Sequence, residues 1–252
     1  MKGSLFQKPL ELSLDITGES WAQGDLIQGE LSIKNHGKET VSLKDYGVFL
    51  AWGETKKVRA KQDKAFKLKQ VRPFENSVEI QSGETKNLKW ALQLEKNCPI
   101  THKSGSLYLL FGKQVDLFEC GLLQIDVGPQ EIINQFLEII EQFIRFKVKD
   151  KKTKGEFIEV KLVPPKSREF AGVDTLYLSV KIHDQQLILN YLFNVKKLAA
   201  TVAVMTLQKS KLEFTQTLDK KQYLQFGDAP NQEGIIQAVS SIINQAKSKI
   251  MY

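Results

Sequence analysis

The chain has few of the residues from which catalytic and metal sites are commonly built. Its 252 residues include two cysteines and three histidines. His36, His102 and His183 are scattered and show no metal-ligand spacing, so we expect no metal site. Cys98 lies close before His102, but catalysis would need a thiolate–imidazole hydrogen bond and a lowered thiol pKa. A buried cysteine beside a surface histidine is the favoured interpretation.

Long apolar runs and glycine-rich nucleotide motifs are also missing. No run reaches the length of a membrane span, and the first residues lack the apolar stretch of a signal peptide. With so few thiols, we expect a reducing, cytoplasmic compartment, with Cys98 and Cys120 free, although their number alone permits a disulfide. Gln114 follows Gly112-Lys113 where a phosphate loop needs Ser or Thr. We expect no cofactor and no enzymatic activity.

Positive charge is present in excess and is concentrated in two segments. The net charge is +7, and residues 56–72 hold eight basic residues against one acid. Residues 145–168 hold nine basic residues against three acids, so the rest of the chain is mildly acidic. Such local charge favours attraction of an acidic partner over general polyanion binding. The candidate partner-binding residues are Lys57, Arg59, Lys61, Lys64, Lys67 and Lys69.

The first basic segment has several interpretations. An acidic or phosphorylated protein is favoured among partners, and an anionic membrane surface would use the same lysines. Nucleic acid is the least expected partner, because only Phe66 and Phe74 offer stacking nearby. The alternative without a partner is an exposed hairpin or edge strand whose lysines prevent aggregation.

Residues 1–127 show the period of half-buried strands. Apolar residues alternate from Leu10 to Ile16 and again from Ile27 to Ile33. At least seven such segments follow one another at roughly ten-residue spacing, separated by Gly-containing turns. This pattern predicts an antiparallel β-sandwich of two sheets.

Residues 128–252 change to a mixed pattern after Gly128-Pro129. Helical periodicity predicts amphipathic helices over about 129–147 and about 231–250. The acidic polar face of the first helix favours packing on a sheet over lying on a membrane. About five strands are expected between them, with the apolar Ala199–Thr206 central in its sheet. They are 157–163, 175–183, 186–195, 200–207 and 211–217.

Two sequence patches carry a family resemblance. Ser20–Ile33 has a strand, a Gly-Asp turn and a second strand, and Ile80–Phe111 has glycine, an apolar strand, a Pro-containing break and a closing strand. The first half thereby resembles the N-terminal domain of arrestin-like proteins, which include arrestins, retromer arrestin-type subunits and bacterial sporulation-control proteins. Gln23 replaces the family's usual proline, and the Tyr-Pro-Gly signature is absent.

The resemblance implies a non-enzymatic adaptor that binds other proteins through strands and loops. The chain is therefore expected to be mainly β, with an arrestin-like sandwich over 1–127 and an α+β domain with two amphipathic helices over 128–252. A divergent second sandwich remains the alternative for the second half. We expect a cytoplasmic adaptor, scaffold or regulatory protein, and the runner-up is a peripheral binder of anionic lipid or nucleic acid.

Overall fold

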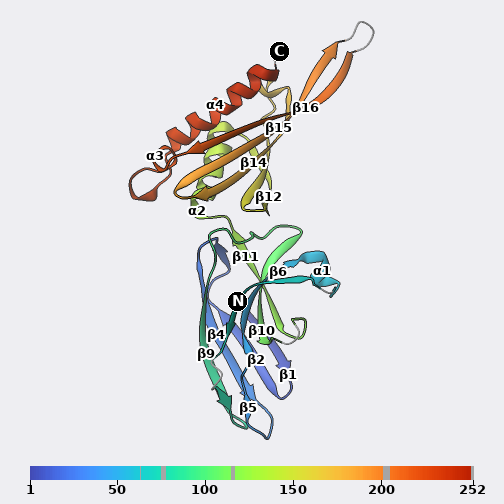
Figure 1. Cartoon of the computed structure of the whole chain (residues 1–252), viewed down its shortest axis with the longest axis vertical. Helices are drawn as coiled ribbons and strands as arrows, with labels where there is room; N and C mark the ends of the chain where they lie inside the picture. The colour runs from blue at the N-terminus through green and yellow to red at the C-terminus, as the bar shows by residue number, and fades with distance from the viewer. Residues whose placement is uncertain (63, 75–77, 115–116, 201–204, 251–252) are drawn as a thin grey trace. The chain divides into compact units, whose positions relative to one another are not determined.

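The computed structural model describes residues 1–62, 64–74, 78–114, 117–200 and 205–250. The fold is mainly β, as predicted, and the chain forms two compact units, Met1–Gly128 and Pro129–Tyr252 (Figure 1). Among the described residues, no helix combines the length and the apolar content that crossing a membrane would require.

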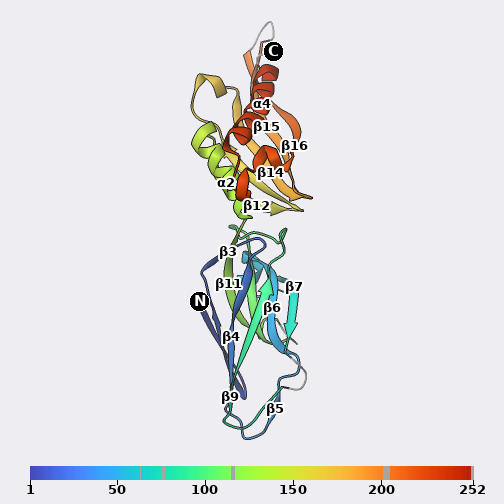
Figure 2. The same cartoon turned by 90° about the vertical axis from the view of Figure 1, so that its left-hand side faces the viewer.

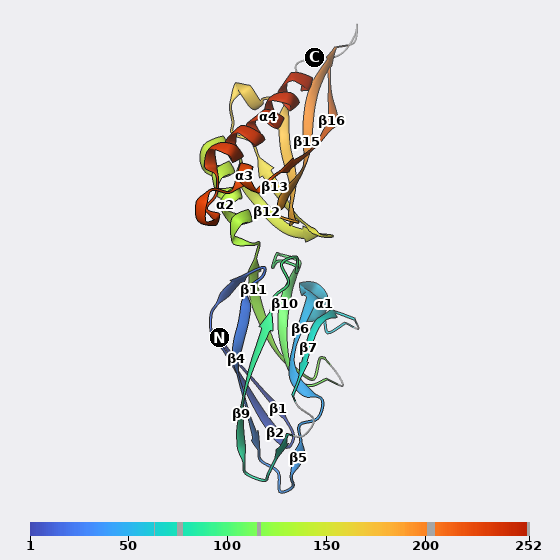
Figure 3. The same cartoon turned by 60° about the vertical axis from the view of Figure 1, so that its left-hand side comes forward.

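The first unit is a sandwich of two sheets, which Figure 3 shows as separate layers. The four-stranded sheet has the order β1-β2-β4-β9. Its strands are β1 (Lys2–Gln7), β2 (Leu10–Ile16), β4 (Leu26–Asn35) and β9 (Thr85–Gln93). The five-stranded sheet has the order β3-β11-β10-β6-β7. Its strands are β3 (Ser20–Ala22), β6 (Tyr46–Glu54), β7 (Phe66–Pro73), β10 (Gly105–Lys113) and β11 (Gly121–Gly128). Strands β5 (Val41–Ser42) and β8 (Glu79–Ile80) form a separate pair.

Alternating side chains build the core between these two sheets. Leu10, Leu12, Leu14 and Ile16 of β2 are buried, and the residues between them are exposed. Strand β10 departs from this pattern because nearly every residue in it is buried. Its second face is covered by a smaller apolar cluster outside the sandwich core. The five-stranded sheet is therefore packed on both faces, and this matters for the candidate site.

The second unit is an α+β fold with a single antiparallel sheet in chain order, β12-β13-β14-β15-β16. Its strands are β12 (Lys147–Lys154), β13 (Phe157–Val163), β14 (Val173–His183), β15 (Gln186–Ala200) and β16 (Met205–Leu218). Its helices are α2 (Glu131–Ile139), α3 (Lys220–Tyr223) and α4 (Gln232–Ile250), with short 3-10 turns at Arg168–Phe170 and Phe226–Asp228. Figures 2 and 3 show α2 and α4 on the same face of the sheet.

The helices lie close to their predicted positions. The first begins at Glu131 and continues beyond α2 as a π-helical turn, Ile140–Ile144. It ends where Arg145 takes a left-handed backbone conformation with φ of 64°. The second helix runs to Ile250, and its buried residues include Ile235, Val239 and Ile243.

The strands of the second unit differ from the prediction in two ways. Strand β12 was not predicted, because Val148 is its one apolar residue. The strand expected over 200–207 includes residues 201–204, which lie outside the described residues. Its described ends belong to two strands, since β15 ends at Ala200 and β16 begins at Met205. The described ends of Ala199–Thr206 are not central in the sheet, because β14 pairs with β15 only as far as Val195 and β16 is the edge strand.

Candidate functional site

The six candidate basic residues lie in one continuous segment at the edge of the five-stranded sheet. Helix α1 (Thr55–Arg59) follows β6 directly, and a short connection leads from it to the edge strand β7 (Figure 1). All six are exposed except Lys57, which is half-buried. They are Lys57 and Arg59 in the helix, Lys61 and Lys64 in the connection, and Lys67 and Lys69 in β7.

Two of these lysines hold unusual backbone conformations. Lys61 and Lys64 have φ of 47° and 59°, in the left-handed region that favours glycine. For other residues this region costs about 1–2 kcal/mol each. The backbone N–H of Lys61 donates to the carbonyl of Val58 at 3.1 Å, and the N–H of Ala65 donates to that of Gln62 at 3.1 Å. The connection is thus built from hydrogen-bonded turns, on which the two lysines are exposed.

An apolar cluster beneath α1 fixes this segment to the sheet. Phe66 contacts Tyr108 edge-on, with ring centroids 5.5 Å apart, and lies 5.2 Å from Phe118. Val58 of α1 packs against the same cluster. A Cβ atom at Gly53 would lie 2.8 Å from Cγ2 of Val58. Glycine at this position therefore permits the close approach of α1 to the sheet.

The segment carries more positive charge than its neighbourhood neutralises. Lys57 Nζ forms an ion pair with Glu54 Oε1 at 2.7 Å. Within the described ranges, the other five candidates form no ion pair. Burial raises the pKa of Tyr108, and the nearby charge of Arg59 partly opposes this. Exposed cations that outnumber the acids near them attract an anionic partner and raise its association rate.

Strand β7 is an edge strand with an irregular register. The pairing shifts between Leu50 and Ala51 of β6, which lie opposite Gln70 and Leu68, so that Lys69 is the extra residue on β7 and Lys67 lies opposite Trp52. Gln70 donates a hydrogen bond from Nε2 to the carbonyl of Gln93 in β9, at 2.8 Å. This bond connects the edges of the two sheets. Bulges and lysines on an edge strand also discourage pairing with other chains, so the interpretation without a partner has structural support.

Cys98 and His102 do not have the features of an activated pair. The Cys98 side chain is buried in the sandwich core, and burial, with a smaller effect of Glu95, raises the pKa of its thiol to about 12. Nδ1 of His102 accepts a hydrogen bond from the backbone N–H of Ser104 at 3.2 Å. A raised thiol pKa opposes thiolate formation. Cys98 and Cys120 are both buried, and neither takes part in a disulfide within the part of the chain that the structure describes.

The second basic segment is dispersed over several elements. It extends from Arg145 at the end of the π-helical turn, through β12 and β13, to Arg168 in a 3-10 turn. Lys152 and Lys154 form ion pairs with the buried Glu159, at 3.1 Å and 2.9 Å. Burial opposes the charge of Glu159, but hydrogen bonds from these lysines outweigh it and lower the pKa of the carboxyl. Part of this segment is therefore used within the sheet.

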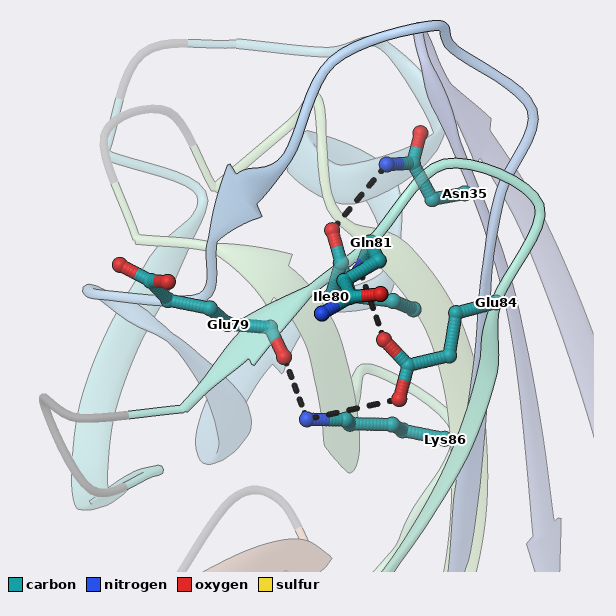
Figure 4. Close-up of polar contacts among 6 residues, drawn as sticks. All are labelled: Asn35, Glu79, Ile80, Gln81, Glu84 and Lys86. Carbon is teal, nitrogen blue, oxygen red and sulfur yellow. Dashed lines mark hydrogen bonds and ion pairs between the residues drawn. The ribbon is translucent and has the colours of Figure 1, made fainter.

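A polar cluster beside strands β5 and β8 is structural. The buried Asn35 donates from Nδ2 to the carbonyl of Ile80 at 3.2 Å. Glu84 accepts a hydrogen bond from the N–H of Gln81 at 2.7 Å and pairs with Lys86 at 3.6 Å. Figure 4 shows these contacts joining the end of β4 to the turn before β9. The cluster holds two connections together and is not a candidate site.

Sequence reasoning omitted two basic residues of the first segment. Lys56 lies in α1 and Arg72 in β7, and both are exposed. Both lie in the same basic run of the sequence, residues 56–72, and this was enough to include them among the candidates. Among the described residues, no group of three or more His, Cys, Asp or Glu side chains could hold a metal ion.

The fold is that of a mainly β protein in which a sandwich precedes an α+β unit. No family model matches the sequence, and no curated protein matches it. Among solved structures, the chain is similar to Spo0M, a sporulation control protein from Bacillus subtilis, with a TM-score of 0.61 and 16% sequence identity. The similarity covers 95% of this chain and 99% of that chain. At this identity it shows the fold alone, and it supports the arrestin-like, sporulation-control-like architecture expected from the sequence.

Two enzymes are much less similar. A β-glucosidase from Listeria innocua has a TM-score of 0.29 and 15% identity, over 47% of this chain and 16% of that chain. The secreted serine protease VesC from Vibrio cholerae has a TM-score of 0.24 and 13% identity, over 82% of this chain and 43% of that chain. TM-scores this low do not indicate a shared fold.

Proposed function

We propose that this protein is a non-enzymatic cytoplasmic adaptor or regulatory protein that binds an acidic protein through the basic surface of its first unit. We define the basic surface as Lys57, Arg59, Lys61, Lys64, Lys67 and Lys69 on α1, β7 and their connection. The observation that carries the proposal is the charge of this surface, because five of its six residues lack an ion pair among the described residues. The regulatory role is supported by the similarity to Spo0M, which is described as a sporulation control protein.

The structure favours a protein partner over other polyanions at this surface. The residues belong to α1, the edge strand β7 and the connection between them, so the charge is confined to one local part of the first unit. Phe66 is buried in the cluster beneath α1, so it offers no face on which a base could stack. Electrostatic complementarity would mainly accelerate association with an acidic protein and select among partners.

Exchange of four lysines for glutamine tests the proposal. The variant Lys61→Gln, Lys64→Gln, Lys67→Gln, Lys69→Gln should retain the fold, since all four side chains are exposed. We expect about a tenfold slower association with the partner at low salt and a flatter salt dependence. The partner would be isolated from native lysate with the wild-type chain and identified by mass spectrometry, and its association would be measured by surface plasmon resonance.

A matched control distinguishes the effect of this surface from the effect of lowering the net charge of the protein. The variant Lys34→Gln, Lys38→Gln, Lys44→Gln, Lys89→Gln removes the same charge from exposed positions elsewhere in the first unit. We expect it to bind the partner like the wild type. Equal binding by wild type and the first variant would contradict the proposal. Two other results would also contradict it. If the first variant alone lost flotation with anionic vesicles, the lysines would be assigned to lipid. If it alone lost a salt-sensitive gel shift, they would be assigned to nucleic acid.

A further inference from the structure

The second unit contains a hollow on the side of its sheet that the helices cover. Three segments line it, namely the end of the π-helical turn Ile140–Ile144 with the residue after it, the loop that leads from β13 to β14, and helix α4. Figure 3 shows that loop, with its turn Arg168–Phe170, on the same side of the sheet as α2 and α4. The hollow has a volume of about 480 Å³. This lies within the range of about 300–1,000 Å³ that is typical of small-molecule sites.

Part of the lining is apolar, and one aromatic residue in it is left accessible. Ile243 of α4 is 4% exposed, and Phe170 is 8% exposed. Phe146 contacts Phe170 edge-on, with ring centroids 5.1 Å apart, and so fixes its position. Phe143 also lines the hollow, but it is 49% exposed. The lining therefore offers apolar contact area to a ligand, as small-molecule sites do.

Lys247 connects α4 to the loop and is neutralised there. Its Nζ forms an ion pair with Glu169 and lies 4.6 Å from the centroid of the Phe170 ring. A cation over an aromatic face is attracted to it, so both contacts hold the loop against the helix. Among the described residues that line the hollow, Glu169 is the one acid. Its charge is thus already matched by Lys247.

Arg145 adds a second positive charge to the hollow, and this charge is unmatched. The residue is exposed, and it forms no ion pair within the described ranges. The nearest acid along the chain is Glu141, whose Oε1 accepts a hydrogen bond from the backbone N–H of Val148 at 2.7 Å. Two cations and one carboxylate in the lining leave the hollow net positive.

The backbone at Arg145 is also unusual. The π-helical turn ends there, and Arg145 takes φ of 64°, in the left-handed region. Helices that end in this conformation normally place glycine or asparagine at it. Both π-helical turns and residues in such unfavourable conformations are frequent at functional sites. Arginine in place of glycine keeps a guanidinium at the hollow despite the backbone cost.

We propose that this hollow binds a small amphipathic anion, an apolar molecule that carries one carboxylate or phosphate group. Arg145 contacts the anionic group, because the guanidinium matches the geometry of carboxylate and phosphate oxygens. Phe143, Phe170 and Ile243 contact the apolar body. The site lies in the second unit and does not depend on the function proposed for the basic surface.

Charge and size favour a small anion over a macromolecule. Nucleic acid binds by having several of its phosphates neutralised, and the hollow offers one unmatched cation. A second copy of the chain carries a net charge of +7, which disfavours its approach to a positive hollow. One turn of a partner helix, about 10 Å wide and 5.4 Å long, already occupies about 420 Å³. The hollow therefore does not seat a helix of useful length.

Titration of the full chain with 8-anilinonaphthalene-1-sulfonate tests the proposal. This dye has an aromatic body and one sulfonate, and its fluorescence rises when it leaves water. We expect saturable binding of one dye per chain, with displacement by decanoate, by decyl phosphate or by both. The more effective competitor identifies the anionic group that the site prefers. The uncharged analogue N-phenyl-1-naphthylamine has the same ring system, so comparison of the two dyes isolates the contribution of the anionic group.

Two variants separate the anionic contact from the apolar one. Arg145→Gln should bind the sulfonate dye about tenfold more weakly, because a hydrogen bond between charged groups is lost. The same variant should bind the uncharged dye like wild type. Ser240→Trp should weaken the binding of both dyes by at least about tenfold, because Ser240 lines the hollow and the larger ring would fill it.

Arg168→Gln is the matched control. Arg168 is exposed and lies in the loop between Ser167 and Glu169, but it does not line the hollow. The control removes the same charge close by and should bind both dyes within about twofold of wild type. Thermal melts verify that all variants are folded.

Several outcomes would overturn the proposal. They are the absence of saturable dye binding, the failure of both competitors to displace the dye, and equal dye binding by wild type and either Arg145→Gln or Ser240→Trp. Equal weakening in Arg145→Gln and Arg168→Gln would also overturn it, since this would show a general attraction of anions and no contact at Arg145.

Discussion

The backbone conformation of two residues between α1 and β7 makes it possible to test whether their side chains serve binding or stability. Lys61 and Lys64 both hold left-handed conformations, which glycine adopts at lower cost. The variant Lys61→Gly, Lys64→Gly should therefore leave the free energy of unfolding unchanged or raise it by up to about 1 kcal/mol. The same variant should weaken capture of the acidic partner, because two exposed cations are lost. Urea denaturation and surface plasmon resonance measure the two effects.

Lys61→Gln, Lys64→Gln is the matched control, since it removes the two charges but still places a polar side chain at each position. It should unfold like wild type and bind like the glycine variant. If the glycine variant were destabilised by more than about 1 kcal/mol, the two side chains would have a structural role instead. Stability and binding are thus separable at these two positions.

Charge in the sequence predicted the exposure of the candidate residues but not their individual surroundings. The basic run of residues 56–72 indicated a solvated segment, and five of the six candidates are exposed. The pairing of Lys57 with Glu54 could not be predicted, because it depends on the helical turn that α1 makes after β6. The φ angles of Lys61 and Lys64 follow from the same local geometry.

The contact between β12 and β13 shows how an edge strand is held by charge. The pKa of Glu159 is lowered by the hydrogen bonds from Lys154 and Lys152, against the effect of burial. A carboxyl with a lowered folded pKa stabilises the fold above its unfolded pKa of about 4.3 and loses this contribution as pH falls further. Glu159→Gln should lower the free energy of unfolding by about 1 kcal/mol at pH 7. The difference from wild type should shrink below about pH 4.

Glu156→Gln serves as the comparison for this effect. Glu156 is largely exposed and pairs with Lys181 at 3.0 Å. Exposed pairs contribute little, so this variant should differ from wild type by less than about 0.5 kcal/mol. Urea unfolding at several pH values measures both. A Glu159→Gln deficit that persisted undiminished at pH 3 would show that its cause is not the carboxylate charge.

Periodicity predicted the elements that bury one regular face and failed for those that do not. The alternation in β2 and the helical faces of α2 and α4 follow directly from their apolar spacing. Strand β12 contains five lysines and one acid, and pairing with β13 holds it rather than apolar burial. Ala199 and Ala200 belong to an apolar stretch that is typical of a central strand, but they lie beyond the end of β14, where β15 pairs with β16 alone.

The molecule as a whole consists of two units, and each described strand pairs only with strands of its own unit. Each sheet contains strands from one side of Gly128 only, among the described residues. We therefore expect residues 1–128 and residues 129–252, expressed separately, to fold with cooperative thermal transitions. Circular dichroism would show β-rich spectra for the first fragment and mixed spectra for the second. A fragment that stayed unfolded alone, but folded when its counterpart was added, would contradict this.

The sequence predicted the fold class of the whole molecule but not its partner. Strand alternation and helical periodicity are properties of one chain, so they predict its sheets and helices. Recognition depends on a second molecule, and a basic surface attracts many acidic ones.

The junction at Gly128-Pro129 has an evolutionary consequence. A recombination breakpoint between the codons of these two residues would leave every described β-ladder intact, because none crosses it. Either half can then be exchanged between genes as a module, and selection can act on each half alone. Homologues that keep one half and replace the other would be the genomic record of such exchange.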